Sequence, residues 1–563
     1  MSRRLPQLIV FWALAPVSFW AQTAPTADEH RAKRVDEVFQ RMDTTVSPGC
    51  ALSVIRDGRI IYERGYGMAD LDHNVPITPN SVFHVASMSK QFTAASILLL
   101  AREGKLSLDD PVRKYIPELA DFGTPVTIRE LIHHTSGLRD QWDLLDLAGW
   151  RYSLDLITDD DVLSVVTRQK DLNFAPGTKY LYSNTGYTLL AQIVKRVSGM
   201  SFREFTTKRI FEPLGMTQTH FRDDHAEIVK HMAYGYAPDG NTFKISLTNF
   251  DTVGATSLLT TVEDLALWDD NFYHPKVGGP ELIRQQLEHG KLNNGEQLEY
   301  ASGLVVSNYR GLTTVDHGGA DAGYRSDMIR FPEQHFSVAC LCNLSSANPS
   351  ELTRKVAEVY LAKEMKPTET PKAESDKGVT LTTEQLESKV GTYLNPDDDQ
   401  VLRISVNAGK LQIGDGDAGE LTAVSENQFR MAKAPVELTF EPLQSGNPLQ
   451  LLVKRGEGKP NHFALVPSFA PSASQLQEYA GMYSSEEIDP LYELKLDGGN
   501  LVLHRVRNKP DVLRPVTLDF FSGSTGTIHF TRNSSGKIAG FTLSTGRVRN
   551  LRFVKGRPAV PVG

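Results

Sequence analysis

A serine and a lysine three residues apart are the pair in this sequence whose types and spacing most directly suggest chemistry. Ser87 and Lys90 lie where a short apolar run from Val82 meets a helical stretch that stops at Gly104. Residues three apart share one face of a helix, and the first helical turn favours a developing anion. A serine hydroxyl becomes a useful nucleophile when a neighbouring base takes its proton. The pair therefore predicts acyl transfer at Ser87; the alternative is that Ser87 only caps the helix.

Two further segments offer the proton route and the oxyanion donors that such a nucleophile needs. Tyr182-Ser183-Asn184 precedes a predicted helix at 185–198, and a phenol beside a lysine can ionise below its usual pKa of about 10 and act as a base. His317-Gly318-Gly319 closes a predicted strand at 311–316, where two glycines let a substrate approach the backbone closely. The alternatives are a buried tyrosine with a satisfied hydroxyl and a turn that happens to carry a histidine.

Two of these spacings have a second copy to which we assign no chemistry. Ser534-x-x-Lys537 lies in an Asn-Ser-Ser-Gly-Lys stretch typical of a turn between strands. Tyr393-x-Asn395 lies inside an internal repeat, where the tyrosine recurs for structural reasons.

In their order along the chain, the motifs at Ser87, Tyr182 and His317 resemble those of the penicillin-binding-protein and class C β-lactamase superfamily. Tyr-x-Asn in second place is the variant of the class C, D-aminopeptidase and esterase branch. Three other stretches are similar to this group: 83–90, 134–138 and 175–177. The resemblance covers residues 34–365, about three-fifths of the chain.

The resemblance implies a role for each motif residue. Ser87 is acylated by the substrate carbonyl, and Lys90 and Tyr182 share its proton, either of them being the base. Asn184 orders the lysine and contacts the substrate amide. The backbone N–H groups of Ser87 and Ala320 form the oxyanion hole, beside His317, Gly318 and Gly319.

His317 departs from the pattern, because most lactamases and carboxypeptidases of the superfamily have lysine there. A lysine cation can hold a substrate carboxylate, whereas a histidine with a pKa of about 6.5 is mostly neutral at pH 7. The resemblance therefore implies a serine hydrolase acting on esters or on D-amino-acid peptides and amides. The alternatives are a β-lactamase or DD-carboxypeptidase and, outside the enzymes, a non-catalytic binding or envelope-scaffold protein on the same fold. If His317 contacts a substrate anion, activity on carboxylate substrates should fall steeply between about pH 6 and 8.

An early hairpin and a late group of strands bracket a helical region. The hairpin strands are expected at 50–55 and 59–66 and the late strands at 311–316, 326–331 and 336–343. Helices are expected at 31–42, 127–134, 158–169, 185–198, 201–210, 261–272 and 348–364, and residues 140–152 are expected to be a loop that lines the pocket. These elements predict an α/β (α+β) layered domain at 31–365, with a mixed sheet flanked by helices and a helical subdomain. The resemblance implies a β-lactamase/transpeptidase-like fold, in which that sheet is antiparallel.

The C-terminal third has a different character. Residues 366–379 are rich in Pro, Lys, Glu, Thr and Ser and predict a linker. Beyond it, five residues recur ninety positions further on: Leu386, Gly391, Tyr393, Gly409 and Leu411 reappear as Leu476, Gly481, Tyr483, Gly499 and Leu501. We expect two small all-β barrel-like repeats, at 380–468 and 469–556. Each either holds a ligand or, as we favour, is a structural module that shapes access to the catalytic domain.

The N-terminus predicts export. Arg3 and Arg4 precede an apolar stretch at 8–21, and the chain turns polar at Gln22. This is the pattern of a signal peptide, 1–21, cleaved after Ala21, with an uncleaved anchor as the alternative. We expect a periplasmic or secreted protein without a membrane span after signal removal. The net charge of −8 argues against a nucleic-acid partner; a small-molecule or peptide substrate is expected, a cell-wall peptide included.

Three cysteines do not make a disulfide framework. Cys340 and Cys342 would lie on one face of a strand. Cys50 could bridge to Cys340, but we favour buried free thiols. Since no metal-ligand motif occurs, neither a metal nor a cofactor is expected.

Overall fold

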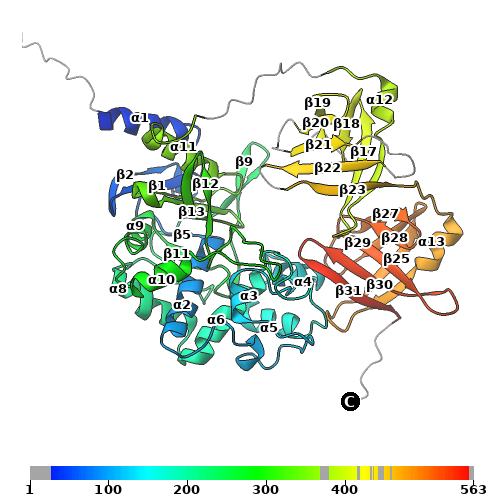
Figure 1. Ribbon diagram of the computed structural model, residues 1–563, viewed down its shortest axis with the longest axis horizontal. Helices are drawn as coiled ribbons and strands as arrows, with labels where there is room; N and C mark the ends of the chain where they lie inside the picture. The colour runs from blue at the N-terminus through cyan, green and yellow to red at the C-terminus, as the bar shows by residue number, and fades with distance from the viewer. Residues whose placement is uncertain are drawn as a thin grey trace, which may run out of the picture.

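The computed structural model describes residues 27–367 and 379–556, apart from 415–418, 432–433, 435, 442–448 and 457–458. The predicted signal peptide and most of the predicted linker lie outside these residues. Figure 1 shows an α/β body joined by two β modules. Within the described ranges, no helix has both the length and the apolar character that crossing a membrane requires.

A six-stranded antiparallel sheet is the centre of the α/β body. In spatial order its strands are β12 (Val305–Tyr309), β13 (Leu312–Asp321), β14 (Tyr324–Phe331), β15 (Phe336–Cys342), β1 (Cys50–Arg56) and β2 (Arg59–Tyr66). The predicted hairpin is confirmed, and β1 joins it to the late strands by pairing with β15. Every pair in this sheet is antiparallel, which confirms what the family resemblance implied and shows that the expectation of a mixed sheet is wrong.

Helices cover both faces of this sheet. On one face α1 (Ala27–Phe39) and α11 (Pro349–Leu361) pack on each other, and α11 packs on β14 and β15. On the other face lies α9 (Val262–Asp270), and behind it runs α2 (Lys90–Arg102), whose residues are buried from Lys90 to Leu100. Burial on all sides up to Leu100 agrees with a helix whose apolar residues are not confined to one face.

The helical subdomain fills the region between the hairpin and the late strands. Its helices are α3 (Ile128–Ile132), α4 (Gln141–Leu147), α5 (Asp159–Thr167), α6 (Asn184–Ser198), α7 (Phe202–Thr206), α8 (Glu212–Leu214) and α10 (Gly279–Gln286). A π-helical turn, Thr207–Phe211, joins α7 to α8. The short strands of the body are β3 (Met68–Asp70), β4 (Val75–Pro76), β5 (Phe83–His84), β6 (Ile157–Thr158), β7 (His220–Phe221), β8 (Tyr236–Asp239), β9 (Thr242–Ile245), β10 (Phe250–Asp251) and β11 (Leu258–Thr260).

The two β modules confirm the repeat. The first contains α12 (Thr383–Glu387) and an eight-stranded sheet: β16 (Gly391–Leu394), β17 (Val401–Asn407), β18 (Lys410–Ile413), β19 (Leu421–Ala423), β20 (Gln428–Met431), β21 (Val436–Phe440), β22 (Gln450–Arg455) and β23 (Asn461–Val466). The second contains α13 (Ala473–Tyr479) and a closed barrel: β24 (Gly481–Ser484), β25 (Tyr492–Asp497), β26 (Asn500–His504), β27 (Asp511–Thr517), β28 (Phe520–Ser522), β29 (Thr527–Arg532), β30 (Ile538–Thr545) and β31 (Val548–Lys555).

Equivalent tyrosines make equivalent contacts in the two modules. The Tyr393 hydroxyl donates to the Lys389 carbonyl at 2.8 Å, and the Tyr483 hydroxyl donates to the Tyr479 carbonyl at 2.7 Å. Each bond ties the first strand of its module to the residues before it. The Gly-x-Tyr repeat is therefore structural, which agrees with setting Tyr393-x-Asn395 aside. Lys537 of the second Ser-x-x-Lys copy lies in a turn and donates its backbone N–H to the Asn533 side chain.

The expectation for the pairing of the cysteines is wrong. Cys50 and Cys342 form a disulfide, whereas we expected free thiols or a bridge to Cys340. The register of β1 against β15 places Cys50 directly opposite Cys342 and Leu52 opposite Cys340. Cys340 keeps a buried free thiol whose sulfur lies 3.7 Å from that of Cys342, so the predicted common face is confirmed.

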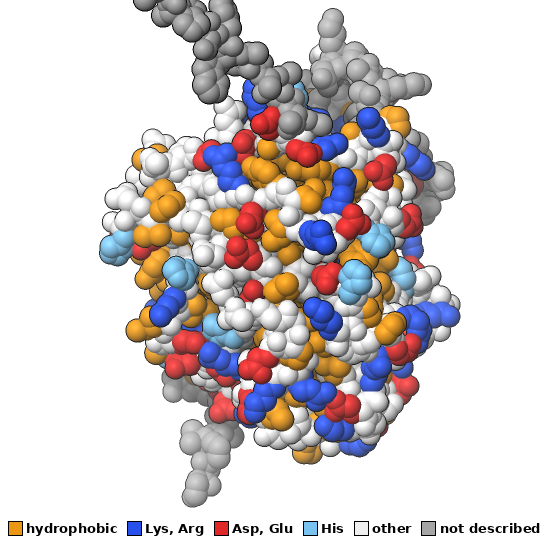
Figure 2. All heavy atoms as spheres, turned by 90° about the vertical axis from the view of Figure 1, so that its left-hand side faces the viewer, with side chains coloured by type: hydrophobic (Ala, Val, Ile, Leu, Met, Phe, Trp, Pro, Cys, Tyr) orange, Lys and Arg blue, Asp and Glu red, His pale blue; other side chains and the backbone are white. Residues whose placement is uncertain are grey.

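Charged side chains of both signs are interspersed on the face of the α/β body that Figure 2 shows. Apolar side chains lie between them rather than in one broad area. That face therefore carries no concentration of one charge.

Candidate active site

Ser87 lies in a short 3-10 turn, η1 (Ala86–Ser89), directly before α2. The residue before it, Ala86, has a φ of +48°, which costs energy for a residue with a side chain. The Ser89 hydroxyl holds this backbone in place by donating to the Ala86 carbonyl at 2.5 Å and accepting from Leu258 N–H at 3.1 Å. Ser87 itself is partly exposed, while Ala86 and Met88 are buried. These contacts hold the turn that carries the predicted nucleophile in a fixed conformation.

The predicted base, Lys90, is fully buried on the first turn of α2 and reaches the nucleophile. Its Nζ lies 3.1 Å from Ser87 Oγ, 2.9 Å from Asn184 Oδ1 and 2.7 Å from the Ala255 carbonyl. The last two atoms only accept hydrogen bonds, so they take two amine protons. The third direction of the amine faces Ser87 Oγ and, in the neutral amine, carries the lone pair.

Asn184 is held in the orientation that this arrangement needs. Its backbone N–H and its Nδ2 both donate to Asp140 Oδ2, at 2.7 and 3.0 Å. Because a carboxylate only accepts, the amide nitrogen must face Asp140 and Oδ1 must face Lys90. Asp140 is buried and caps α4 through a bond from Trp142 N–H at 3.0 Å. The expectation that 140–152 is a loop lining the pocket is therefore wrong, since this stretch begins with a capped helix.

Burial changes the protonation of Lys90. Removal from water lowers the pKa of its ammonium group to about 7, against the attraction of Asp321 and Asp140, which raise it, and with a further lowering from Arg547. A lysine with this pKa is neutral in a large fraction of molecules at neutral pH. Lys90 can therefore accept a proton from Ser87.

The third predicted catalytic residue, Tyr182, lies against the same amine. The Lys90 Nζ lies 4.9 Å from the centroid of its ring, and its hydroxyl has the Ser87 side chain as a hydrogen-bond partner. Burial raises the pKa of this phenol well above 10. The expectation of a lowered pKa is wrong, because burial outweighs the lowering by the Ser87 hydrogen bond and by the charge of Arg547. Tyr182 is a neutral phenol that can donate a proton, and Lys90 is the better base.

His317, Gly318, Gly319 and Ala320 lie inside β13 rather than after it. The strand continues to Asp321, and β12 pairs with it only as far as Asp316. A Cβ on Gly319 would lie 2.2 Å from the Val85 carbonyl oxygen. Gly319 is thus required by the contact between β13 and the Ser87 turn, and not only, as we expected, by the approach of a substrate.

His317 is a neutral residue in this site. Its Nδ1 lies 2.6 Å from the Gly318 carbonyl, so Nδ1 carries the proton, and Nε2 accepts from the Tyr300 hydroxyl at 3.2 Å. Burial, together with the charge of Lys90, lowers the pKa of His317 to about 4. A pKa this far below 6 argues against His317 as the source of a loss of activity between pH 6 and 8.

These residues open into a pocket of about 440 Å³. Its walls come from Ser87, Tyr182, residues 317–320 of β13, Ser326 of the neighbouring strand β14, and residues 347–350 at the start of α11. Arg325 of β14 also lines it, and sequence reasoning missed this residue. Its guanidinium donates to the carbonyls of Ala322 and Tyr324, and no carboxylate of the described residues pairs with it. The charge of Asp321 also acts on this guanidinium, and burial lowers the pKa of Arg325. The wall of the pocket therefore carries an arginine that forms no ion pair with a described carboxylate.

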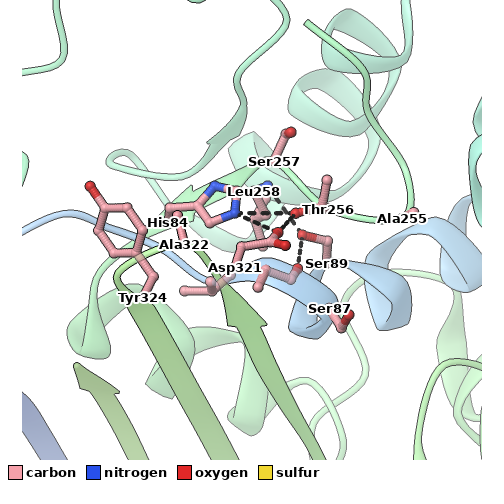
Figure 3. A network of polar contacts seen from close by, with 12 residues as sticks. His84, Ser87, Ser89, Ala255, Thr256, Ser257, Leu258, Asp321, Ala322 and Tyr324 are labelled. Carbon is pink, nitrogen blue, oxygen red and sulfur yellow. Dashed lines mark hydrogen bonds and ion pairs between the residues drawn. The ribbon is translucent and has the colours of Figure 1, made fainter. Parts of the chain in front are cut away.

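A network of buried polar groups lies beside the Ser87 turn (Figure 3). His84 Nε2 lies 2.9 Å from Asp321 Oδ2 and 3.1 Å from Thr256 Oγ1, and the hydroxyls of Thr256 and Tyr152 donate to Asp321. Although burial raises the pKa of Asp321, the hydrogen bonds from these partners lower it below its usual value. The network thus fixes the end of β13 to β5, which leads into the Ser87 turn.

His134 is a further residue that sequence reasoning left without a function. Its Nδ1 accepts from Ser183 N–H at 3.1 Å, and its ring lies 4.2 Å from the ring of Tyr182. The residue holds a φ of +57° and is buried. It therefore fixes the backbone that carries Tyr182 and Asn184. Its place in the 134–138 stretch, which is part of the family resemblance, was the available signal.

The chain belongs to the β-lactamase family, a family of serine hydrolases, since the family model matches residues 35–363. Penicillin-binding protein 4* of Bacillus subtilis is 30% identical over 437 residues, 73% of this chain and 94% of that relative. The octameric penicillin-binding protein homologue from Pyrococcus abyssi has a TM-score of 0.54 and 24% identity over 85% of this chain and 99% of its own. EstCE1, a hydrolase with promiscuous acyltransferase activity, has a TM-score of 0.50 and 22% identity over 59% of this chain and 99% of its own. These two structures support the β-lactamase/transpeptidase fold for this chain. The antiparallel sheet and the two β modules described above agree with that fold.

Proposed function

We propose that the protein is an exported serine hydrolase that forms an acyl-enzyme at Ser87 and acts on esters or on D-amino-acid-containing peptides and amides. The observation that carries this proposal is the contact of the buried Lys90 amine with Ser87 Oγ at 3.1 Å. Its other two contacts leave the lone pair of the neutral amine directed at the serine hydroxyl.

The reaction begins when Ser87 Oγ attacks the substrate carbonyl carbon and its proton passes to Lys90 Nζ. The backbone N–H groups of Ser87 and Ala320 bind the oxygen of the tetrahedral intermediate. Tyr182 gives its proton to the leaving group and recovers one from Lys90, so that the bond to the leaving group breaks and Ser87 is left as an ester. A water molecule then attacks this ester, gives its proton to Lys90, and the acid product leaves as Ser87 regains its hydrogen.

The neutral His317 supports substrates that need no carboxylate contact at that position. Its pKa of about 4 leaves it without charge at neutral pH. The name of EstCE1 states a hydrolase with acyltransferase activity, which agrees with an ester or amide as acyl donor. We further propose that Asn184, whose amide is fixed by Asp140, contacts a substrate amide.

A β-lactamase or DD-carboxypeptidase is the second candidate, and Arg325 favours it. Substrates of both kinds carry a carboxylate, and Arg325 is a cation on the wall of the Ser87 pocket without a carboxylate partner among the described residues. A bidentate arginine–carboxylate contact would hold such a substrate. Hydrolysis of nitrocefin or of a D-Ala-D-Ala peptide, measured beside chromogenic esters and D-aminoacyl anilides, ranks the two candidates.

Covalent labelling tests the nucleophile. A fluorophosphonate or penicillin probe should label the wild-type protein and Ser534→Ala equally and should not label Ser87→Ala. Ser534 is the matched control because it begins the other Ser-x-x-Lys spacing. Equal labelling of Ser87→Ala would remove Ser87 as the nucleophile and overturn the proposal, whereas absence of labelling in the wild type would favour the non-catalytic binding or scaffold protein.

Export rests on Arg3, Arg4 and the apolar stretch at 8–21. Expression of the full chain in a bacterial host should place the mature protein outside the cytoplasm with Gln22 at its N-terminus. Retention of the first 21 residues on a membrane-bound protein would favour the uncleaved anchor instead.

A further inference from the structure

We propose that Arg547, in the turn between β30 and β31 of the second barrel, is a positioning residue for the catalytic lysine, acting through Asp140 and Asn184. The inference deepens the proposed function and rests on it. It assigns the second barrel a direct part in the active site of the α/β body, beyond shaping access to it.

The contacts form a continuous chain. Arg547 Nη1 lies 3.4 Å from Asp140 Oδ2, the same oxygen that accepts from the backbone and side chain of Asn184. Asn184 Oδ1 in turn accepts from Lys90 at 2.9 Å, and Lys90 reaches Ser87 at 3.1 Å. Each step therefore fixes the next, and the first step comes from a residue more than four hundred positions along the chain from Asp140.

The backbone of the turn that carries Arg547 is hydrogen-bonded to the segment around Asp140 as well. The Arg547 carbonyl accepts from Asp140 N–H at 3.1 Å and from Asn173 Nδ2 at 2.9 Å. Its N–H donates to Asp143 Oδ2 at 2.7 Å. Arg549, two residues on, donates its N–H to Asn173 Oδ1 at 2.7 Å. Figure 1 shows this end of the barrel beside α4, which Asp140 caps. Hydrogen bonds of Arg547 and Arg549 thus hold the turn against Asp140, Asp143 and Asn173 of the α/β body.

The charge of Arg547 also reaches Lys90. Three charged groups act on Lys90: Asp140 before α4, Asp321 at the end of β13 and Arg547 in the barrel turn. The titratable rings around the amine are neutral, and they belong to His134, His317, Tyr182 and Tyr187. The two carboxylates favour the protonated lysine, and Arg547 opposes them. Removal of the guanidinium should therefore leave Lys90 more often protonated and its amide partner less firmly held.

The test is Arg547→Gln, which keeps the backbone contacts and removes the charge. The Arg547 side chain is 31% exposed, so the variant should fold, and thermal unfolding checks that it does. We expect the labelling rate of Ser87 by a fluorophosphonate to fall at pH 7 by about two-fold or more, and its acid limb to move up by roughly half a pH unit. Arg547→Lys should restore most of the profile.

Arg552→Gln is the matched control. Arg552 also joins the second barrel to the α/β body, through Asp171 at 2.6 Å, but it has no contact with Asp140. Its loss should leave the labelling profile unchanged. A shift of equal size in Arg552→Gln would overturn the proposal, because the effect would then come from docking of the barrel in general.

A second measurement separates this inference from the proposed function. NMR titration of ¹³C-lysine-labelled protein, with Lys90→Met to assign the signal, reports the protonation of Lys90 whether or not Ser87 reacts. A higher pKa of Lys90 in Arg547→Gln than in the wild type supports the positioning role, and identical titrations overturn it. Absence of Ser87 labelling in the wild type would overturn the proposed function instead.

Discussion

Arg139 and Glu487 form an ion pair of 2.6 Å between the α/β body and the second barrel, with side chains that are 0% and 3% exposed. The remaining donors of Arg139 bond to Gln169 and to the carbonyls of Arg549 and Asn550. Three of these four partners belong to the barrel, so without it the buried guanidinium would lose its carboxylate and most of its hydrogen bonds. Arg139 directly precedes Asp140, which holds Asn184 in the active site. The contact with the barrel therefore supports the segment that carries Asp140.

Loss of one partner of this pair should be costly. Glu487→Ala would leave a buried guanidinium without its carboxylate, and we expect a loss of about 3 to 5 kcal/mol in the free energy of unfolding. Urea unfolding followed by fluorescence measures it. The double variant Arg139→Met with Glu487→Leu should be markedly more stable than Glu487→Ala alone. Equal stability of the single variant and the wild type would contradict the burial of this pair.

The pH dependence of catalysis should report Lys90. Its lowered pKa of about 7 means that the amine is protonated, and thus unable to take the Ser87 proton, as the pH falls below 7. We expect the acid limb of kcat/KM to have an apparent pKa near this value, measured with a neutral ester between pH 5 and 9. His317 titrates at about 4, so His317→Gln should keep the limb in place. Movement of the limb in that variant would assign it to the histidine.

Local pattern was enough to predict the elements that carry the site. Ser87 and Lys90 on one turn, the hairpin around Asp57 and Gly58, and the Gly-x-Tyr repeat all depend on residues close together in sequence. Each is set by periodicity or turn chemistry, which a single sequence displays.

Properties that depend on distant neighbours could not be predicted in the same way. The pairing of Cys50 with Cys342 follows from the register of two strands far apart in sequence. The raised pKa of Tyr182 and the lowered pKa of His317 follow from burial, and burial is a property of the assembled pocket. Asp140 likewise became a partner of Asn184 only through the packing of α4 beside α6.

Two neighbouring glycines should differ in their tolerance of a side chain. A Cβ on Gly319 would lie 2.2 Å from the Val85 carbonyl oxygen, whereas on Gly318 the nearest atom, the Ser326 carbonyl oxygen, lies 3.2 Å away. Gly319→Ala must push β13 away from the Ser87 turn, and we expect a loss of about 2 to 3 kcal/mol together with most of the activity. Gly318→Ala, the matched control, should lose far less stability and far less activity. Differential scanning calorimetry and ester hydrolysis measure both, and equal effects of the two changes would contradict this geometry.

The disulfide predicts a specific pattern of thiol reactivity. Since Cys50 is bonded to Cys342, denaturation without a reductant should expose one thiol of the three cysteines, that of Cys340. Alkylation with iodoacetamide followed by peptide mass spectrometry measures this. After reduction all three should react, which is the control. Labelling of Cys50 before reduction would contradict the pairing.

Arg325 should decide whether the pocket accepts anionic substrates. It lines the Ser87 pocket, and within the described part of the chain its guanidinium donates to the Ala322 and Tyr324 carbonyls and forms no ion pair, although the charge of Asp321 acts on it. In Arg325→Gln we expect KM for a carboxylate-bearing substrate to rise about ten-fold, equivalent to roughly 1.4 kcal/mol, with kcat little changed. The same variant should hydrolyse a neutral ester of equal size at the wild-type rate, and Arg325→Lys should recover part of the affinity. If KM and rate change equally for both substrates in Arg325→Gln, the arginine supports β14 rather than binding the acyl donor. A neutral ester or amide is then the better description of the substrate.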